Sequence, residues 1–141
     1  MTSFTRSLAK EVKGSGVQIL GFSPGMLTTD MLTSPNVVGE RDVPVDALYG
    51  VQTLRAVENF PITGIPVAHF PTLVRALAMV KLAAARANAR LGLLPGPIAA
   101  AIEQAAQEVI DGHHHGHFVV DMVQGGAGTS TNMNANEVIA N

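Results

Sequence analysis

Two apolar, glycine-terminated segments in the second half of the chain constrain its fold most strongly. Residues 72–90 and 98–110 each repeat apolar side chains at the three- and four-residue spacing of an amphipathic helix. Gly92 and Gly112 follow the two segments and are suited to end helices, and Pro97 stands where a first helical turn tolerates it. Because the connection between the segments is short, we predict an antiparallel helical hairpin.

Composition limits how the core of this hairpin can be built. Apolar residues make up 47% of the 141 residues, whereas aromatic residues make up only 4% and tryptophan is absent. The core must therefore use alanine, valine, leucine, isoleucine and methionine. Thr72 is suited to be the N-cap of the first helix. The residues expected on the apolar sides are Leu73, Leu77 and Val80 on the first helix and Ile102, Ala105, Ala106 and Val109 on the second. Apolar surface left exposed over 72–110 predicts self-association.

Charge and cysteine content exclude several classes of function. The net charge of −2 gives no electrostatic basis for binding nucleic acid. Without cysteine, the chain has no disulfide, no thiolate catalyst and no cysteine-ligated zinc. The first residues lack the apolar core of a signal peptide, and no apolar run approaches the roughly 20 residues that span a bilayer. We therefore expect a cytoplasmic protein that binds neither nucleic acid nor a membrane.

The other segments are shorter and change character near Ser34-Pro35. Four prolines between residues 36 and 71 exclude a long helix there. Before that point, a helix followed by a strand reads as half of an α/β unit. The elements that we expect in chain order are a helix over 3–13, a buried strand over 17–22, a short helix over 46–57, an extended run at 118–120 and a last helix from near Thr131.

Residues 124–141 concentrate glycines, small hydroxyls and asparagines. The glycines let the backbone turn sharply and approach a ligand closely. Thr129, Ser130 and Thr131 place three hydroxyls at a helix start, where free N–H groups and the helix dipole favour anions. Asn132 and Asn136, four residues apart, would share one polar helix face. Taken alone, the segment is either an anion site or a glycine-rich turn with hydroxyl N-caps.

The letters GGAGTSTNMNANEVIAN resemble the substrate-binding segment of the fumarase/aspartase superfamily. Ala127 and Ser130 stand where class II fumarases typically carry serine and glutamine, which favours the aspartate ammonia-lyase form. The resemblance implies that Thr129 helps to hold the substrate and that Gly128 and Ser130 flank the pocket. Asn132 is a further candidate, either facing the ligand or structural.

A second block, GERDVPVDALYGVQTLRAVENFPITG at residues 39–64, resembles the N-terminal signature of the same superfamily. By spacing alone, Arg55 and Glu58 would be an exposed helical pair. Under the resemblance, Thr53 and Arg55 become candidates for supporting the pocket without touching the substrate. The similarity covers residues 36–141. It implies a mainly α fold, the truncated N-terminal helical domain of such a lyase, with a short α/β appendage in front.

The resemblance also implies a reaction. Intact enzymes of this kind convert aspartate to fumarate and ammonia, so the partner is a small molecule, aspartate or fumarate. Preorganised hydroxyl and amide donors stabilise the doubly charged aci-carboxylate, and Thr129 would be one of them. No metal or other cofactor is implied. The family's catalytic serine lies in a G-S-S-x-M-P-x-K-x-N loop, which these residues lack, as they lack the long-helix domain that assembles homotetramers. We therefore expect no catalytic residue here and no activity from this fragment alone.

Residues 1–34 form a different segment. The stretch 3–32 resembles a short-chain dehydrogenase/reductase just beyond its Tyr-x-x-x-Lys motif, with Pro24-Gly25 and Thr28 matching the part that contacts nicotinamide. Because that Tyr and Lys and any glycine-rich dinucleotide loop are missing, we expect no NAD(P) binding. Two alternatives stay open, a class II fumarase-like hydratase fragment and a non-catalytic fusion or gene-prediction product with an oxidoreductase remnant.

Histidines cluster at DGHHHGH. Neutral imidazoles bind zinc, nickel and copper readily. Adjacent side chains seldom converge on one ion, however, and only Asp111 accompanies His113, His114, His115 and His117. We therefore expect a solvated loop and no metal site.

Overall fold

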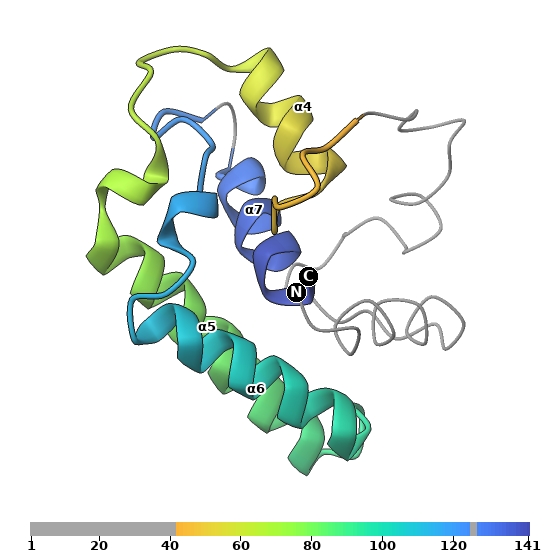
Figure 1. Cartoon of the computed structure of the whole chain (residues 1–141). Coiled ribbons are helices and arrows are strands. Elements are labelled where there is room, and N and C mark those ends of the chain that lie inside the picture. Colours follow the sequence, from red (N-terminus) through yellow and green to blue (C-terminus); the bar gives the residue numbers. More distant parts are fainter. Residues whose placement is uncertain (1–41, 125–126) are drawn as a thin grey trace.

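A computed structural model describes residues 42–124 and 127–141, and this part of the chain is helical (Figure 1). The α-helices are α4 (Val51–Asn59), α5 (Pro71–Arg90), α6 (Gly96–Ile110) and α7 (Thr129–Ala140), and the 3₁₀ turns are η1 (Val67–His69) and η2 (His115–His117). These elements confirm the mainly α fold. The α/β appendage, the elements expected over 3–13 and 17–22, and the segment 1–34 lie outside the described residues. None of the described helices is both long and apolar enough to cross a membrane.

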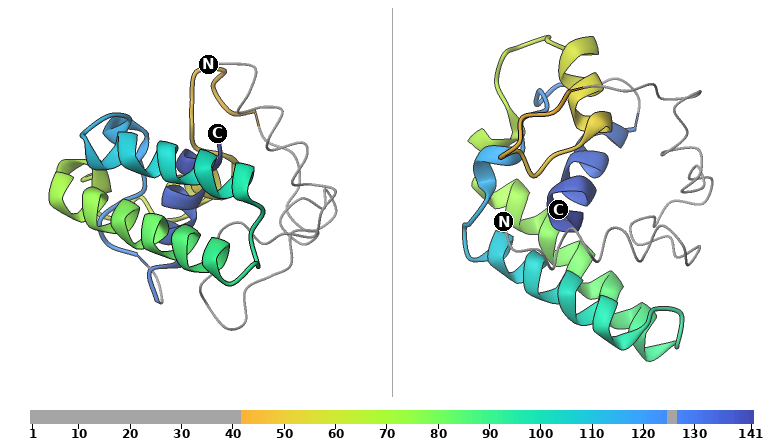
Figure 2. Two further views of the ribbon diagram at one scale, coloured as in Figure 1. Left: turned by 90° about the horizontal axis from the view of Figure 1, so that it is seen from below. Right: turned by 45° about the vertical axis from the view of Figure 1, so that its right-hand side comes forward.

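Helices α5 and α6 form the predicted antiparallel hairpin, and they lie side by side from each direction shown (Figure 2). Pro71 and Pro97 occupy the first turns of the two helices, where a missing N–H costs no helical hydrogen bond. Gly92 and Gly112 follow the helix ends with φ of +69° and +104°. Their predicted role in ending the helices is confirmed, since side chains disfavour this left-handed region.

The buried face of α5 differs from the prediction. Val74, Ala78 and Ala85 are buried, whereas Leu73 and Val80 are 45% and 62% exposed. Alanines let the two helix backbones approach closely, so the interface follows the small side chains and not the largest apolar ones. Ile102, Ala106 and Val109 on α6 are buried as predicted, while Ala105 is only partly buried.

Three predicted element boundaries are corrected. Helix α5 begins at Pro71 with Phe70 as its N-cap, so Thr72 is not the cap. Helix α4 begins at Val51, later than the expected start at 46, because Ala47 is in a turn closed on the Pro44 carbonyl oxygen. Helix α7 begins at Thr129, two residues before the expected start.

Residues 118–121 form no strand, but they hydrogen-bond to the segment before α5. The N–H groups of Val67 and Ala68 donate to the carbonyl oxygens of Val120 and Phe118, each at 2.9 Å. A single antiparallel bridge pairs Pro66 with Asp121. The predicted extended run therefore exists as a short backbone tie between η1 and the segment that leads to α7.

Helix α7 lies at the centre of the described part, between α4 and the hairpin (Figure 1). Its Ala135 and Val138 belong to an apolar cluster that includes Val74 and Phe118. Its Ile139 belongs to a second cluster inside the hairpin. Burying a side chain of this size contributes about 1.5–3 kcal/mol. The packing of α7 therefore holds its N-terminal turn in a defined place.

Candidate functional site

The first turn of α7 carries the residues that the sequence singled out. Gly128 is the N-cap, with φ of +74° in the left-handed region, and no described side chain caps the helix. Thr129 is exposed, and Ser130 is partly exposed. The first N–H groups of a helix have no acceptor within it. Two hydroxyls and several N–H donors are therefore presented together at the positive end of the helix dipole.

Lys81 of α5 lies beside this turn. Its Nζ donates to Oδ1 of Asn132 at 2.5 Å. The amine is partly buried, and this burial lowers the pKa of Lys81. No carboxylate in the described residues forms an ion pair with it. The sequence analysis missed Lys81, although a lysine between the apolar residues Val80 and Leu82 is a signal for a placed charge.

Two further asparagines of α7 point inward. Asn136 is 1% exposed, so the predicted polar face shared with Asn132 does turn toward the interior. Asn134, which was not singled out, accepts from the Val120 N–H at 3.4 Å and donates to the His117 carbonyl oxygen at 2.9 Å. Asn134 is thus a structural residue that holds residues 117–120 against α7.

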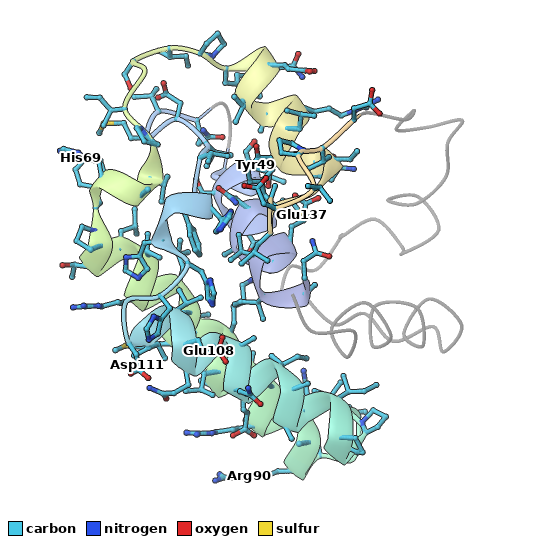
Figure 3. All side chains as sticks on the ribbon, viewed as in Figure 1. Tyr49, His69, Arg90, Glu108, Asp111 and Glu137 are labelled. Carbon is cyan, nitrogen blue, oxygen red and sulfur yellow. The ribbon has the colours of Figure 1, made fainter. Side chains whose placement is uncertain are left out.

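The candidates on α4 lie near the other end of α7. Thr53 is fully buried and Arg55 is partly buried. The N–H groups of Gly50, Gln52 and Thr53 donate to the carboxylate of Glu137 at 2.9, 3.0 and 3.0 Å. Figure 3 shows Glu137 on the side of α7 that faces α4. The structure therefore joins the two blocks, 39–64 and 124–141, through a residue that the sequence analysis did not name.

The histidine cluster holds local structure together. His115 Nε2 lies 2.8 Å from the Val109 carbonyl oxygen, and His117 Nδ1 accepts from the Leu48 N–H at 3.3 Å. His114 Nε2 lies 3.2 Å from Glu108. Across residues 42–124 and 127–141, no group of three or more histidine or carboxylate side chains is placed to hold a metal ion.

This helical arrangement has counterparts among known proteins. Residues 39–141 match the lyase family. The chain belongs to this lyase family. The match includes both sequence blocks and all four described α-helices, and it confirms the fumarase/aspartase superfamily that the two blocks predicted. Residues 3–32 precede the matched region.

Individual members of the lyase family are similar over most of the chain. An aspartate ammonia-lyase from Pseudomonas aeruginosa is 62% identical over 106 residues, which cover 75% of this chain and 22% of that relative. A class II fumarate hydratase from Halobacterium salinarum is 55% identical over 115 residues, or 82% of this chain and 24% of that relative.

The fold is also shared with a solved structure. The crystal structure of fumarate lyase:delta crystallin from Brucella melitensis superposes with a TM-score of 0.70 at 62% identity, covering 72% of this chain and 23% of that chain. The chain therefore spans less than a quarter of the length of each of these three proteins.

Proposed function

We propose that residues 36–141 supply one wall of the active site of an aspartate ammonia-lyase, which eliminates ammonia from L-aspartate to form fumarate. The observation that carries the proposal is the first turn of α7, which no described side chain caps and where Thr129 and Ser130 present hydroxyls beside the first N–H groups of the helix. Such donors favour a carboxylate. Aspartate ammonia-lyases that are 50–62% identical to this chain support the choice of reaction.

In this proposal each site residue has a role. The Thr129 hydroxyl donates to a substrate carboxylate, whose negative charge increases when the neighbouring carbon loses its proton. Gly128 and Ser130 flank the pocket, and the left-handed Gly128 shapes the turn. Because Oδ1 of Asn132 accepts from Lys81, the Asn132 amide nitrogen is left to donate to an anion. Donors that are preorganised around growing charge lower the barrier of such a step.

Thr53 and Arg55 support the wall from α4 without touching the substrate. The base that removes the proton, and the remaining walls, belong to parts of the enzyme outside these residues. The elimination is redox-neutral, and we propose no cofactor for it.

We also infer a cytoplasmic, homotetrameric enzyme, as the resemblance implies. We propose that residues 1–34 are a separate, dehydrogenase-like segment that binds no nucleotide. The fluorescence of NADPH should therefore stay unchanged when the protein is added to it.

A chimera tests the proposed function directly. Residues 39–141 replace the part that they match in the P. aeruginosa aspartate ammonia-lyase, and fumarate formation from aspartate is followed by absorbance. We expect an active chimera and no turnover by the 141-residue polypeptide alone. A chimera that is folded and correctly assembled but inactive would contradict the lyase assignment of this segment. Turnover by the 141-residue polypeptide alone would contradict the inference that the base lies outside these residues.

Similarity to the Halobacterium fumarate hydratase favours one second candidate, a class II fumarase. That enzyme would form fumarate from malate and not from aspartate. Assaying the chimera with each substrate separates the two, since we expect fumarate from aspartate only.

A further inference from the structure

The carboxylate of Glu137 is the one charged side chain through which α7 contacts α4 in the described structure. It accepts three backbone N–H bonds from the start of α4, donated by Gly50, Gln52 and Thr53. Each bond is charge-assisted, and the negative charge lies at the positive end of the α4 dipole. The side chain thus serves as the N-terminal cap of a helix 84 to 87 residues away in sequence.

The space for this carboxylate depends on Gly50. A Cβ atom at position 50 would lie 2.8 Å from Oε1 and 2.9 Å from Cδ of Glu137, too close for either atom to stay in place. The φ of Gly50 is −116°, which any residue adopts. Glycine therefore leaves the space that the carboxylate occupies, and an alanine would displace the carboxylate without removing its charge.

The clamp between Glu137 and residues 50–53 is directional, unlike most of the packing of α7. Ala135, Val138 and Ile139 pack by apolar contact, which depends little on orientation. Asn134 and Asn141 also form hydrogen bonds, but they bind the loops at 117–120 and Leu48. The Glu137 clamp, by contrast, joins α7 to the N-terminal turn of a second α-helix.

We infer that Glu137 is a positioning residue, whose clamp on the start of α4 sets the rotation and axial position of α7 and hence the orientation of the Thr129 and Ser130 donors. The inference rests on the proposed function for the role of those donors. Thr129 lies eight residues before Glu137, a little over two helical turns, so a regular helix transmits a displacement from one end to the other.

The test compares backbone amide NMR spectra of the full 141-residue chain and of its variants. Glu137→Gln removes the charge, Glu137→Asp shortens the side chain, and Gly50→Ala displaces the carboxylate. We expect each change to shift the amide resonances of Thr129 and Ser130 as well as those at 50–53. Fumarate is the probe ligand for the chimera carrying the same changes. Its affinity should fall about tenfold, because a misplaced donor weakens a charge-assisted bond to the carboxylate.

Val138→Ala is the matched control, because it removes buried apolar volume from the same helix and leaves the clamp intact. Val138→Ala should lower the free energy of unfolding without shifting the Thr129 and Ser130 amide resonances. If Glu137 were merely structural, its substitution would likewise leave those resonances unchanged. If Glu137→Gln does not fold, Glu137→Asp and Gly50→Ala decide the question.

Two outcomes separate this inference from the proposed function. Shifts confined to residues 50–53, with unchanged Thr129 and Ser130 amides and unchanged fumarate affinity, overturn the positioning role. Failure of the unsubstituted chimera to bind fumarate counts against the proposed function, while shifts at Thr129 in the variants would still support the positioning role.

Discussion

At the scale of single residues, carboxylates in this protein act as acceptors for backbone N–H groups far away in sequence. Glu137 does this for the start of α4. Asp121 does it for the turn before η1, where it accepts from the Thr63 and Gly64 N–H groups and the Thr63 hydroxyl, and it also accepts from the Val123 N–H. In each case the carboxylate exchanges several water contacts for backbone donors that the fold holds in place.

Asp121 predicts an acid-dependent loss of stability. Burial alone would raise the pKa of its carboxyl, but hydrogen bonds from Val123, Thr63 and Gly64 outweigh it and lower the pKa from 3.8 to about 2. The stabilisation is therefore complete above pH 3.8 and is lost as the pH falls toward about 2. Asp121→Asn should lower the free energy of unfolding at pH 7 and flatten its pH dependence in that window. Urea unfolding at several pH values measures both effects. If the unfolding free energy of Asp121→Asn changed with pH as steeply as that of the native chain, Asp121 would not be the group responsible.

Thr129 predicts a loss of rate without a loss of fold. In the active chimera, Thr129→Val keeps the shape of the side chain and removes its hydroxyl. We expect kcat/KM for aspartate to fall by about 100-fold, the usual effect of losing one donor to a developing anion. Thr72→Val, at an exposed position at the start of α5, is the control and should retain full activity. Equal rates for the two variants would remove Thr129 from the site.

At the scale of elements, glycine and alanine decide where α5 ends and which of its faces is buried. Gly92 adopts a left-handed conformation with no heavy atom near the position of a Cβ. Ala78 and Ala85 lie at the interface, and larger side chains such as Met79 and Val80 are left exposed. Side-chain size therefore outweighs hydrophobicity in orienting this helix.

Gly92→Ala isolates the cost of the left-handed backbone. Because a Cβ would meet open space, only conformational strain changes, and the free energy of unfolding should fall by about 1 kcal/mol. Gly116→Ala is the control: it also faces open space but has no positive φ, so it should change stability by less than about 0.5 kcal/mol. Chemical denaturation measures both variants. Equal losses would show that strain is not the cause.

Two valines on α5 test which of its faces is buried. Val74 is fully buried and Val80 is 62% exposed. Val74→Ala should lower the free energy of unfolding by about 2 kcal/mol through lost burial and a small cavity, whereas Val80→Ala should change it little. Thermal unfolding of the two variants measures the difference, and the reverse order would restore the face predicted from the sequence.

At the scale of the whole molecule, α7 is the helix against which the other described α-helices pack. Helix α7 contacts α4, α5 and α6, and its first turn carries the donors of the proposed site. The exposed surface of α5 includes apolar side chains, since Leu73, Met79 and Val80 are between 45% and 62% exposed. Apolar groups clustered on one exposed face promote association.

Self-association of the 141-residue chain follows from that face. Its mass from size exclusion with light scattering should rise with protein concentration, and Val80→Lys should reduce the rise because a charge resists burial. Thr72→Lys, which adds a charge at the exposed start of the same helix, is the control. A mass that stays monomeric at all concentrations would contradict the prediction.

Local sequence sufficed for the features that depend on neighbouring residues. The hairpin of α5 and α6, its glycine stops and the hydroxyl-rich start of α7 follow from spacing, chain conformation and turn chemistry, and the two sequence blocks sufficed for the superfamily. The buried face of α5 was beyond this reasoning, because apolar residues occur on nearly every side of that helix.

The hydrogen-bond partners of α7 depend on contacts between residues far apart in sequence. The bond between Lys81 and Asn132 joins residues 51 apart, and the Glu137 clamp joins residues up to 87 apart. No local pattern selects such partners, since many donors and acceptors in the chain are chemically equivalent. The sequence by itself therefore determined which helices form and where the hydroxyl-rich turn lies. Only the tertiary structure decided which cation stands beside that turn and which carboxylate holds its helix, because those choices depend on which faces pack together.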